Sequence, residues 1–283
     1  MGFWKSLFTG KDETPEESIQ KEEAKNFDIF KFDGVRAQRM GRLDYALRCY
    51  DEALNLKEDF ETLSYKSTTL IAMNRLEEAR DVLKRMSELQ PQRTETHITL
   101  ANILFMTDEY EAMKASAAKA VECNEENPMA YYLLGKAEEA LQHPEAAIEA
   151  LTKAIEKQPD FIEALNSRAG LLEESGNSEK AMADIKEVLK LNEEDETALA
   201  LRAYIYYKVE NNTEKAKADY RHIIDLNPFN KQAYIALIAL LQSEGNTEEA
   251  QKLEEEASAL NLNNEDMPNY SIGGMEKRDV LGL

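Results

Sequence analysis

Cysteine is scarce in this chain of 283 residues, which has only Cys49 and Cys123. Small secreted domains that depend on disulfides carry many more cysteines, so a disulfide framework is excluded. The repeat register derived below also places the two cysteines on different repeats. We therefore expect both thiols to be reduced.

Long apolar runs are missing, and basic residues are outnumbered. No segment approaches the roughly 20 apolar residues of a membrane span, and the first residues turn acidic too early for a secretory signal. The chain has 34 Lys and Arg but 55 Asp and Glu, which gives a net charge of −21. This charge repels phosphate backbones and anionic headgroups. We predict a soluble, cytoplasmic protein that binds no nucleic acid and does not insert stably into membranes. The acidity itself indicates either a well-solvated surface or a basic or amphipathic partner.

Catalytic and metal-binding motifs are missing too. The three histidines, His97, His143 and His222, lie 46 and 79 residues apart, and no cysteine pair clusters with them. There is no glycine-rich phosphate loop, no HExxH pair and no GxSxG turn. We predict that the chain is not an enzyme and uses no cofactor or metal.

Small residues, in contrast, recur at a fixed interval. In the first series the steps are 33, 34, 34, 34, 35 and 34 residues: Ala46, Ala79, Met113, Ala147, Ala181, Ala216 and Ala250. A second series lies seven residues later, which is two turns of helix: Ala53, Met86, Ala120, Ala154, Val188, Ile223 and Ala257. A third lies about twelve residues before the first: Gly34, Ser67, Ala101, Gly135, Ala169, Ala203 and Ile238. Each repeat thus holds two helices.

The fourth repeat carries the fullest motif, Tyr131-x-x-Leu134-Gly135, then Ala147-x-x-x-Leu151-x-x-Ala154, then Pro159. This motif resembles the tetratricopeptide repeat (TPR) consensus, and the first and fifth repeats are similar to it. The resemblance covers roughly residues 27 to 264. It implies an all-α, right-handed superhelical solenoid of about seven helix-turn-helix hairpins that binds other polypeptides.

The period divides the chain into three parts. Residues 1–26 form an N-terminal extension, residues 27–264 the array, and residues 265–283 a C-terminal tail. We expect the repeats at 27–59, 60–93, 94–127, 128–161, 162–195, 196–230 and 231–264. Pro91, Pro159 and Pro228 stand in turns between repeats, because proline ends helices.

The resemblance also indicates where a ligand would lie, because one side of each first helix lines the concave surface of such arrays. Aromatic rings and amides on that side suit an apolar or amphipathic peptide. The candidate residues are Ile98, Asn102, Phe105, Tyr132, Lys136, Asn166, Tyr204, Tyr207 and Ile235. The alternative is that Tyr204 and Tyr207 only pack between adjacent repeats.

Some family members instead clamp the acidic C-terminal tails of chaperones with Lys, Asn and Arg on three consecutive repeats. The candidates for such a clamp here are scattered over four repeats: Lys31, Asn102, Lys136 and Asn166. Glu139 and Glu173 beside them would repel a carboxylate. A carboxylate clamp is therefore disfavoured.

Both ends of the chain carry short apolar sets. Phe3, Trp4, Leu7 and Phe8 lie at helical spacing and have four interpretations: docking on the first repeat, disorder, weak membrane contact or partner contact. The tail, with Tyr270, Ile272, Val280 and Leu281, either is extended and mobile, folds back along the array or is itself a recognition motif.

We predict a scaffold or adaptor that binds a peptide or helical segment of a partner in its concave groove. The alternatives are a co-chaperone-like protein, a regulatory subunit of an enzyme complex, and a self-associating structural protein.

Overall fold

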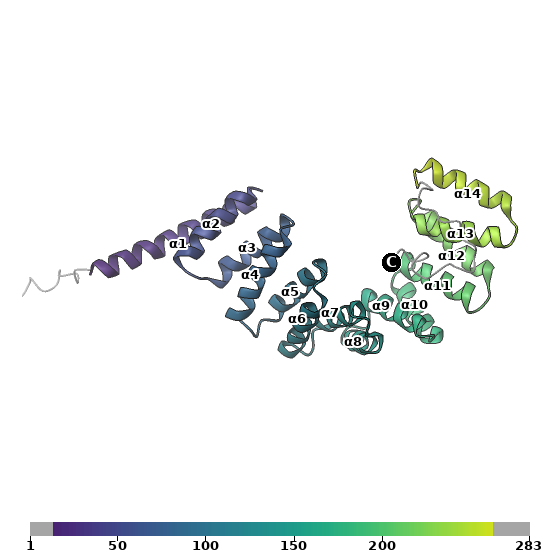
Figure 1. Ribbon diagram of the computed structural model, residues 1–283, viewed down its shortest axis with the longest axis horizontal. Coiled ribbons are helices and arrows are strands. Elements are labelled where there is room, and N and C mark those ends of the chain that lie inside the picture. Colours follow the sequence, from purple (N-terminus) through teal and green to yellow (C-terminus); the bar gives the residue numbers. More distant parts are fainter. Residues whose placement is uncertain (1–13, 263–283) are drawn as a thin grey trace, which may run out of the picture. The chain divides into compact units, whose positions relative to one another are not determined.

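The computed structural model describes residues 14–262, which fold into fourteen α-helices without a strand (Figure 1). The predicted all-α solenoid of hairpins is confirmed. The apolar residues of the first thirteen positions and of the C-terminal tail lie outside the described residues.

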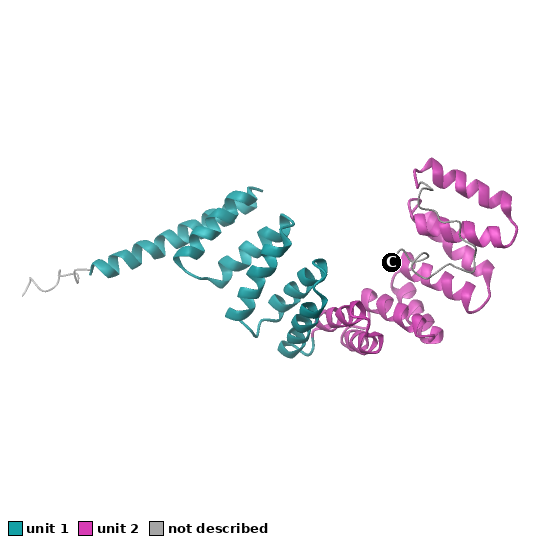
Figure 2. Ribbon diagram, in the orientation of Figure 1, with its two compact units in different colours: residues 1–126 teal, residues 127–283 magenta. Residues whose placement is uncertain are grey.

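The chain divides into two compact units, Met1–Glu126 and Asn127–Leu283 (Figure 2). In unit 1 the described helices are α1 (Pro15–Arg39), α2 (Leu43–Leu56), α3 (Phe60–Ala72), α4 (Leu76–Leu89), α5 (Thr94–Met106) and α6 (Tyr110–Cys123). Unit 2 holds α7 (Pro128–Ala140), α8 (Pro144–Lys157), α9 (Ile162–Glu174), α10 (Ser178–Leu191), α11 (Glu196–Lys208), α12 (Thr213–Leu226), α13 (Lys231–Ser243) and α14 (Thr247–Ala259). The division into extension, array and tail stays a prediction.

Within each unit the helices pack as hairpins, α1 on α2 and α3 on α4, and so on along the chain. The second helix of a hairpin also contacts the first helix of the next, as α2 contacts α3 and α8 contacts α9. Each hairpin therefore covers the apolar side of its neighbour, which is how a solenoid is stabilised.

Side-chain caps begin many of the helices. Thr14 and Glu17 form a capping box at the start of α1. Asp59 and Asp195 accept hydrogen bonds from the third backbone N–H of α3 and α11, 2.9 Å from the nitrogens of Thr62 and Ala198. These caps satisfy N–H groups that have no partner inside the helix.

A left-handed residue follows the first helix of every described hairpin and turns the chain toward the second helix. At these positions φ lies between 51° and 77°: Gly41, Asn74, Asp108, Gln142, Gly176, Asn211 and Gly245. Glycine adopts this conformation without strain, whereas other residues pay a steric cost. The seven residues form a further periodic series that the sequence analysis did not identify.

The first predicted series forms the seam of the hairpins. Its alanines are fully or almost fully buried, and Met113 is fully buried in their place. Glycine allows the two helices of a hairpin to approach closely: a Cβ added to Gly135 would lie 2.8 Å from Cγ of Leu151. Gly135 therefore lies at a close contact between α7 and α8.

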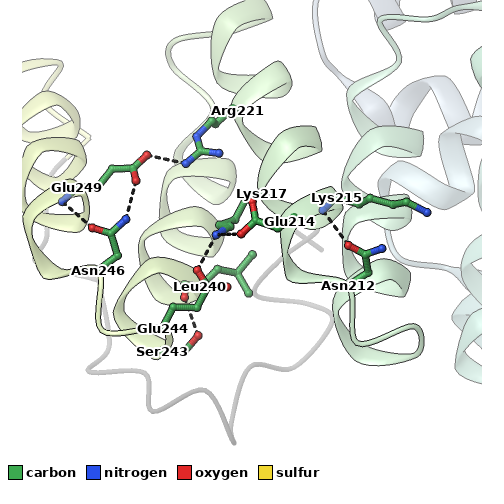
Figure 3. A network of polar contacts seen from close by, with 10 residues as sticks. All are labelled: Asn212, Glu214, Lys215, Lys217, Arg221, Leu240, Ser243, Glu244, Asn246 and Glu249. Atoms are coloured by element: carbon green, nitrogen blue, oxygen red, sulfur yellow. Dashed lines mark hydrogen bonds and ion pairs between the residues drawn. The ribbon is translucent and has the colours of Figure 1, made fainter.

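Ion pairs join the last two hairpins of unit 2 (Figure 3). Lys217 on α12 is buried, and its Nζ donates to Glu214 and, at 2.6 Å, to Glu244 beyond α13. Arg221 donates to Glu249 on α14 at 2.6 Å, and Asn246 donates to the other oxygen of that carboxylate at 2.8 Å. The contacts tie α12 to both ends of the α13–α14 turn.

Candidate functional site

The nine predicted ligand-binding residues all lie on first helices of hairpins. Ile98, Asn102 and Phe105 are on α5 in unit 1, and the other six are on α7, α9, α11 and α13 in unit 2. Asn102 and Phe105 are exposed, whereas the other seven are half-buried.

The exposed aromatic residue of α5 is Phe105, which is 43% exposed. Its ring centroid lies 6.2 Å from that of Tyr110 on α6, in a tilted arrangement. Asn102 turns its Nδ2 back onto its own helix, where it donates to the carbonyl of Ile98 at 3.1 Å. This face therefore offers an aromatic pair and the amide oxygen of Asn102.

On α7 the two predicted residues have neighbours of different kinds. The Tyr132 ring lies against the ring of buried Phe161, with centroids 5.1 Å apart. Lys136 Nζ donates to the carboxylate of Glu139, one turn further along the helix. Tyr132 is thus held in place by the next hairpin, and the charge of Lys136 is balanced within its own helix.

Asn166 on α9 reaches the next hairpin. Its Nδ2 donates to Asp195 Oδ1 at 3.0 Å, and the same oxygen caps α11 by accepting from the Ala198 nitrogen. The Oδ1 of Asn166 is buried and has no hydrogen-bond partner among residues 14–262. Asn166 therefore positions the start of α11, and only its amide oxygen is left to accept a bond.

On α11, Tyr204 and Tyr207 pack against the apolar core formed by α11 to α14, as the packing interpretation of these residues expects. Burial raises the pKa of Tyr204, and the nearby carboxylates of Glu173 and Glu174 on α9 raise it further. Lys208 lies 5.3 Å from the centre of the Tyr207 ring. Both rings are only half-buried, so they pack between helices and still present part of their surface.

The remaining candidate of unit 2 is Ile235 on α13, which is also half-buried. The face that the four first helices of unit 2 share thus has apolar residues on α7, α11 and α13. Carboxylates of Glu139, Glu173 and Glu174 stand at the ends of α7 and α9. We call this set of residues the α7–α13 face.

Lys31, which the sequence analysis named as a candidate for a carboxylate clamp, is buried and does not face a ligand. Its Nζ lies 3.0 Å from Asp59 Oδ2 and also donates to Glu61, so it joins α1 to the start of α3. Lys31, Lys136 and the Asn166 amide already donate to carboxylates of the chain, and Asn102 donates to its own helix, so these four residues form no preformed set of donors for a carboxylate.

Two Arg–Asp pairs on the second-helix side of unit 2 were not identified from the sequence. Arg168 on α9 holds both oxygens of Asp184 on α10 at 2.7 and 2.8 Å, and its Nη1 donates to Thr152 on α8. Arg202 and Asp219 repeat the arrangement between α11 and α12 at 2.8 Å. Each pair lines a shallow hollow, of about 390 Å³ and 430 Å³ respectively. The repeat period could have indicated these pairs, because Arg168 and Arg202 share one register of the repeat and Asp184 and Asp219 share another.

Among residues 14–262, no three His, Cys, Asp or Glu side chains come together in a way that could hold a metal ion. None of the helices described here combines the length and the apolar character that a membrane crossing requires. Cys49 is buried and Cys123 is half-buried, and both are free thiols.

Comparison with known proteins gives the same repeat. The tetratricopeptide repeat pattern matches residues 98–160 and 132–198, and a second form of it matches residues 197–230. Among solved structures, the MamA protein is 27% identical with a TM-score of 0.57, over 60% of this chain and 94% of that chain. A search of curated proteins gave no match.

Two further solved structures are similar in fold alone. YrrB, described as a TPR protein with an unusual peptide-binding site, is 22% identical with a TM-score of 0.54, over 65% of this chain and 95% of that chain. The C-terminal part of a TPR repeat-containing protein from Cytophaga hutchinsonii is 18% identical with a TM-score of 0.61, over 78% of this chain and 92% of that chain.

Proposed function

We propose that this chain, which is a tetratricopeptide repeat protein and a protein–protein interaction scaffold, binds a segment of a partner protein on the α7–α13 face of unit 2. The partner is held reversibly by its side chains and backbone, without chemistry. In unit 1 the proposal includes Ile98, Asn102 and Phe105 on α5 as a second contact face.

The observation that carries the proposal is the placement of Tyr204. Its half-buried ring rests on the apolar core of α11 to α14 and stands beside the carboxylates of Glu173 and Glu174. A ring fixed in this way offers contact area at a small entropic cost, because packing has already restricted its rotation. The neighbouring carboxylates favour a cation close to the apolar contact.

This combination selects a segment in which apolar residues alternate with Lys or Arg. The net charge of −21 attracts such a segment from a distance and repels acidic ones. The hydrogen bonds of Lys31, Lys136 and Asn166 support the same preference, because each of these side chains already donates to a carboxylate of the chain itself.

The test uses immobilised synthetic peptides of two kinds, apolar residues alternating with Lys and Arg or with Asp and Glu. We expect the full chain to bind the basic set, and Tyr204→Ala with Tyr207→Ala to weaken that binding. Tyr206→Ala is the matched control, because this tyrosine lies between the other two on α11 but stacks under Lys215, 4.7 Å away. Phe105→Ala tests the face of α5 in the same assay.

Thermal melting of each variant separates lost binding from lost fold. A folded double variant that binds the basic peptides as well as the wild type does would refute the assignment of the tyrosines. Preference for the acidic peptides would refute the proposed partner chemistry.

A further inference from the structure

The outward side of α1 carries two apolar residues, Ile29 and Phe32, that residues 14–262 leave exposed. Ile29 has the register that, in the other hairpins, belongs to residues no more than 3% exposed: Thr62, Thr96, Ala130, Ala164, Ala198 and Ala233. The helices α3 and α5 each contact the second helix of the hairpin before them. Ile29 is 46% exposed and Phe32, one turn further on, is 63% exposed.

The opposite side of α1 faces α3, and this contact fixes the orientation of the helix. Lys31 points toward α3 and pairs with Asp59 and Glu61 there. Ile29 is two residues away, about 200° around the helix, so it points away from α3. Tyr45 on α2 is also exposed, and its pKa is raised chiefly by a hydrogen bond with Cys49, with a smaller contribution from the charge of Asp33 on α1.

The beginning of α1 has no cover among the described residues either. Residues 15–25 are exposed around the whole helix, including Ile19. An isolated helix of this length is marginal in water, because the cost of its first turn is not recovered by packing. A further segment lying along α1 would supply that packing.

We propose that the outward side of α1 is the docking surface for the chain's own first thirteen residues. These residues carry four apolar side chains at helical spacing, which are Phe3, Trp4, Leu7 and Phe8. Their burial against Ile29 and Phe32 takes the place of the hairpin that would otherwise precede α1.

The connection is long enough. As a helix, Trp4 to Phe8 spans about 6 Å, and the six residues from Phe8 to Thr14 span up to about 21 Å when extended, so that Trp4 reaches about 27 Å from Thr14. Ile29 and Phe32 lie 14 and 17 residues beyond Pro15, which is about 21 and 26 Å along a helix that rises 1.5 Å per residue. Trp4 therefore reaches both with the chain reversing direction at Thr14.

The chain's own segment also has an advantage over a second copy of the protein. A short flexible connection gives the segment an effective concentration in the millimolar range at its surface. A second molecule at micromolar concentration would have to bind about a thousandfold more tightly to compete equally.

Tryptophan fluorescence tests the proposal directly, because Trp4 is the only tryptophan of the chain. In the full chain we expect its fluorescence to lie at shorter wavelength than that of free tryptophan, with weak quenching by acrylamide. Both properties should be unchanged across a dilution series and on addition of phosphatidylcholine vesicles. Phe32→Glu should shift the emission to longer wavelength and increase quenching. Phe229→Glu is the matched control, because Phe229 is 67% exposed but lies in unit 2.

Each other outcome overturns the proposal. Emission like that of free tryptophan in the wild type shows that Trp4 is not docked, whatever the variants do. If neither Phe32→Glu nor Ile29→Ser changes the emission, Trp4 lies on another surface. A loss of the shift on dilution identifies a second copy as the occupant, and a shift that appears only with vesicles identifies a bilayer. Circular dichroism of each variant confirms that the helices are retained.

Discussion

The Tyr50 ring lies directly on the backbone of Gly34: a Cβ added to this glycine would be 2.5 Å from Cε1 of the tyrosine. The hydroxyl of the same ring donates to Gln38 at 2.7 Å, so the ring is held from both ends. Leu151 lies in the same way on Gly135 in the fourth hairpin. In these two hairpins the distance between the helices is set by a missing side chain.

Enlarging Gly135 should destabilise unit 2. Leucine in place of glycine gains about 1 kcal/mol of helix propensity. We expect Gly135→Leu nevertheless to lower the free energy of unfolding by about 1–3 kcal/mol, because it overpacks against buried Leu151. Urea denaturation measures the change. Ala140→Leu, on the same helix but half-buried, is the control, and equal midpoints for both variants would contradict the assignment.

Removing one partner of the Arg168–Asp184 pair should destabilise the fold strongly, whereas replacing both residues by apolar ones should change the stability little. Asp184→Ala leaves a largely buried guanidinium unpaired, and we expect a loss of about 3 kcal/mol. The chain provides the replacement, because α7 and α8 carry Leu134 and Ala150 at the same register. Arg168→Leu together with Asp184→Ala should lie within about 1 kcal/mol of the wild type. A double variant as unstable as the single one would refute this account.

The left-handed positions predict opposite effects for two substitutions. Gln142 has φ of 62°, so Gln142→Gly should relieve strain and stabilise the chain by about 1 kcal/mol. Gly176→Ala should cost about as much, and only through the backbone, because an added Cβ would meet nothing within 4 Å. Melting temperatures that move in the same direction for both variants would contradict the explanation.

Acid should destabilise the fold. Hydrogen bonds from Arg85, Arg80 and Arg221 hold the pKa of Glu58, Glu109 and Glu249 below the ordinary value of 4.5. The unfolded chain therefore binds more protons than the folded chain as pH falls, so the stabilisation is complete above about pH 4.5 and is lost below it. We expect the urea midpoint to decrease from about pH 5 to about pH 3.

The acid experiment has one opposing effect, since protonation also relieves repulsion among the excess carboxylates. About 0.15 M salt screens charges separated by more than about 8 Å and limits that effect. Glu249→Gln removes one of the perturbed groups and should make the midpoint less sensitive to pH. A midpoint that rises on acidification would show that repulsion outweighs the ion pairs.

The fold was predictable because close packing imposes a size limit on side chains at a regular interval. Only small residues, or a methionine such as Met113 that fits, are compatible with the seam positions, and this limit is visible in one sequence. The left-handed series was harder to see, because glycine, asparagine, aspartate and glutamine all occur in it. The Arg168 and Arg202 pairs were missed because either residue alone resembles a solvated charge.

The candidate site was less predictable, because helical register gives the side of a helix but not the partners of a side chain. Lys31 has the register of a ligand-facing residue, but its Nζ donates to two carboxylates that lie 28 and 30 residues later in the sequence. Asn166 similarly meets a capping aspartate 29 residues away. Such pairings depend on which charges the next hairpin brings close. The ligand-binding roles of the nine residues stay predictions.

Among residues 14–262 the last helix is α14, which buries only Ala250 and Ala257 and carries an exposed ion pair between Glu248 and Lys252. A hairpin appended after it would have to remove these charges from water without giving them new partners, which is unfavourable. An engineered longer version of the chain should therefore be built by duplicating an internal hairpin, such as α9 with α10, and leaving α14 as the final helix.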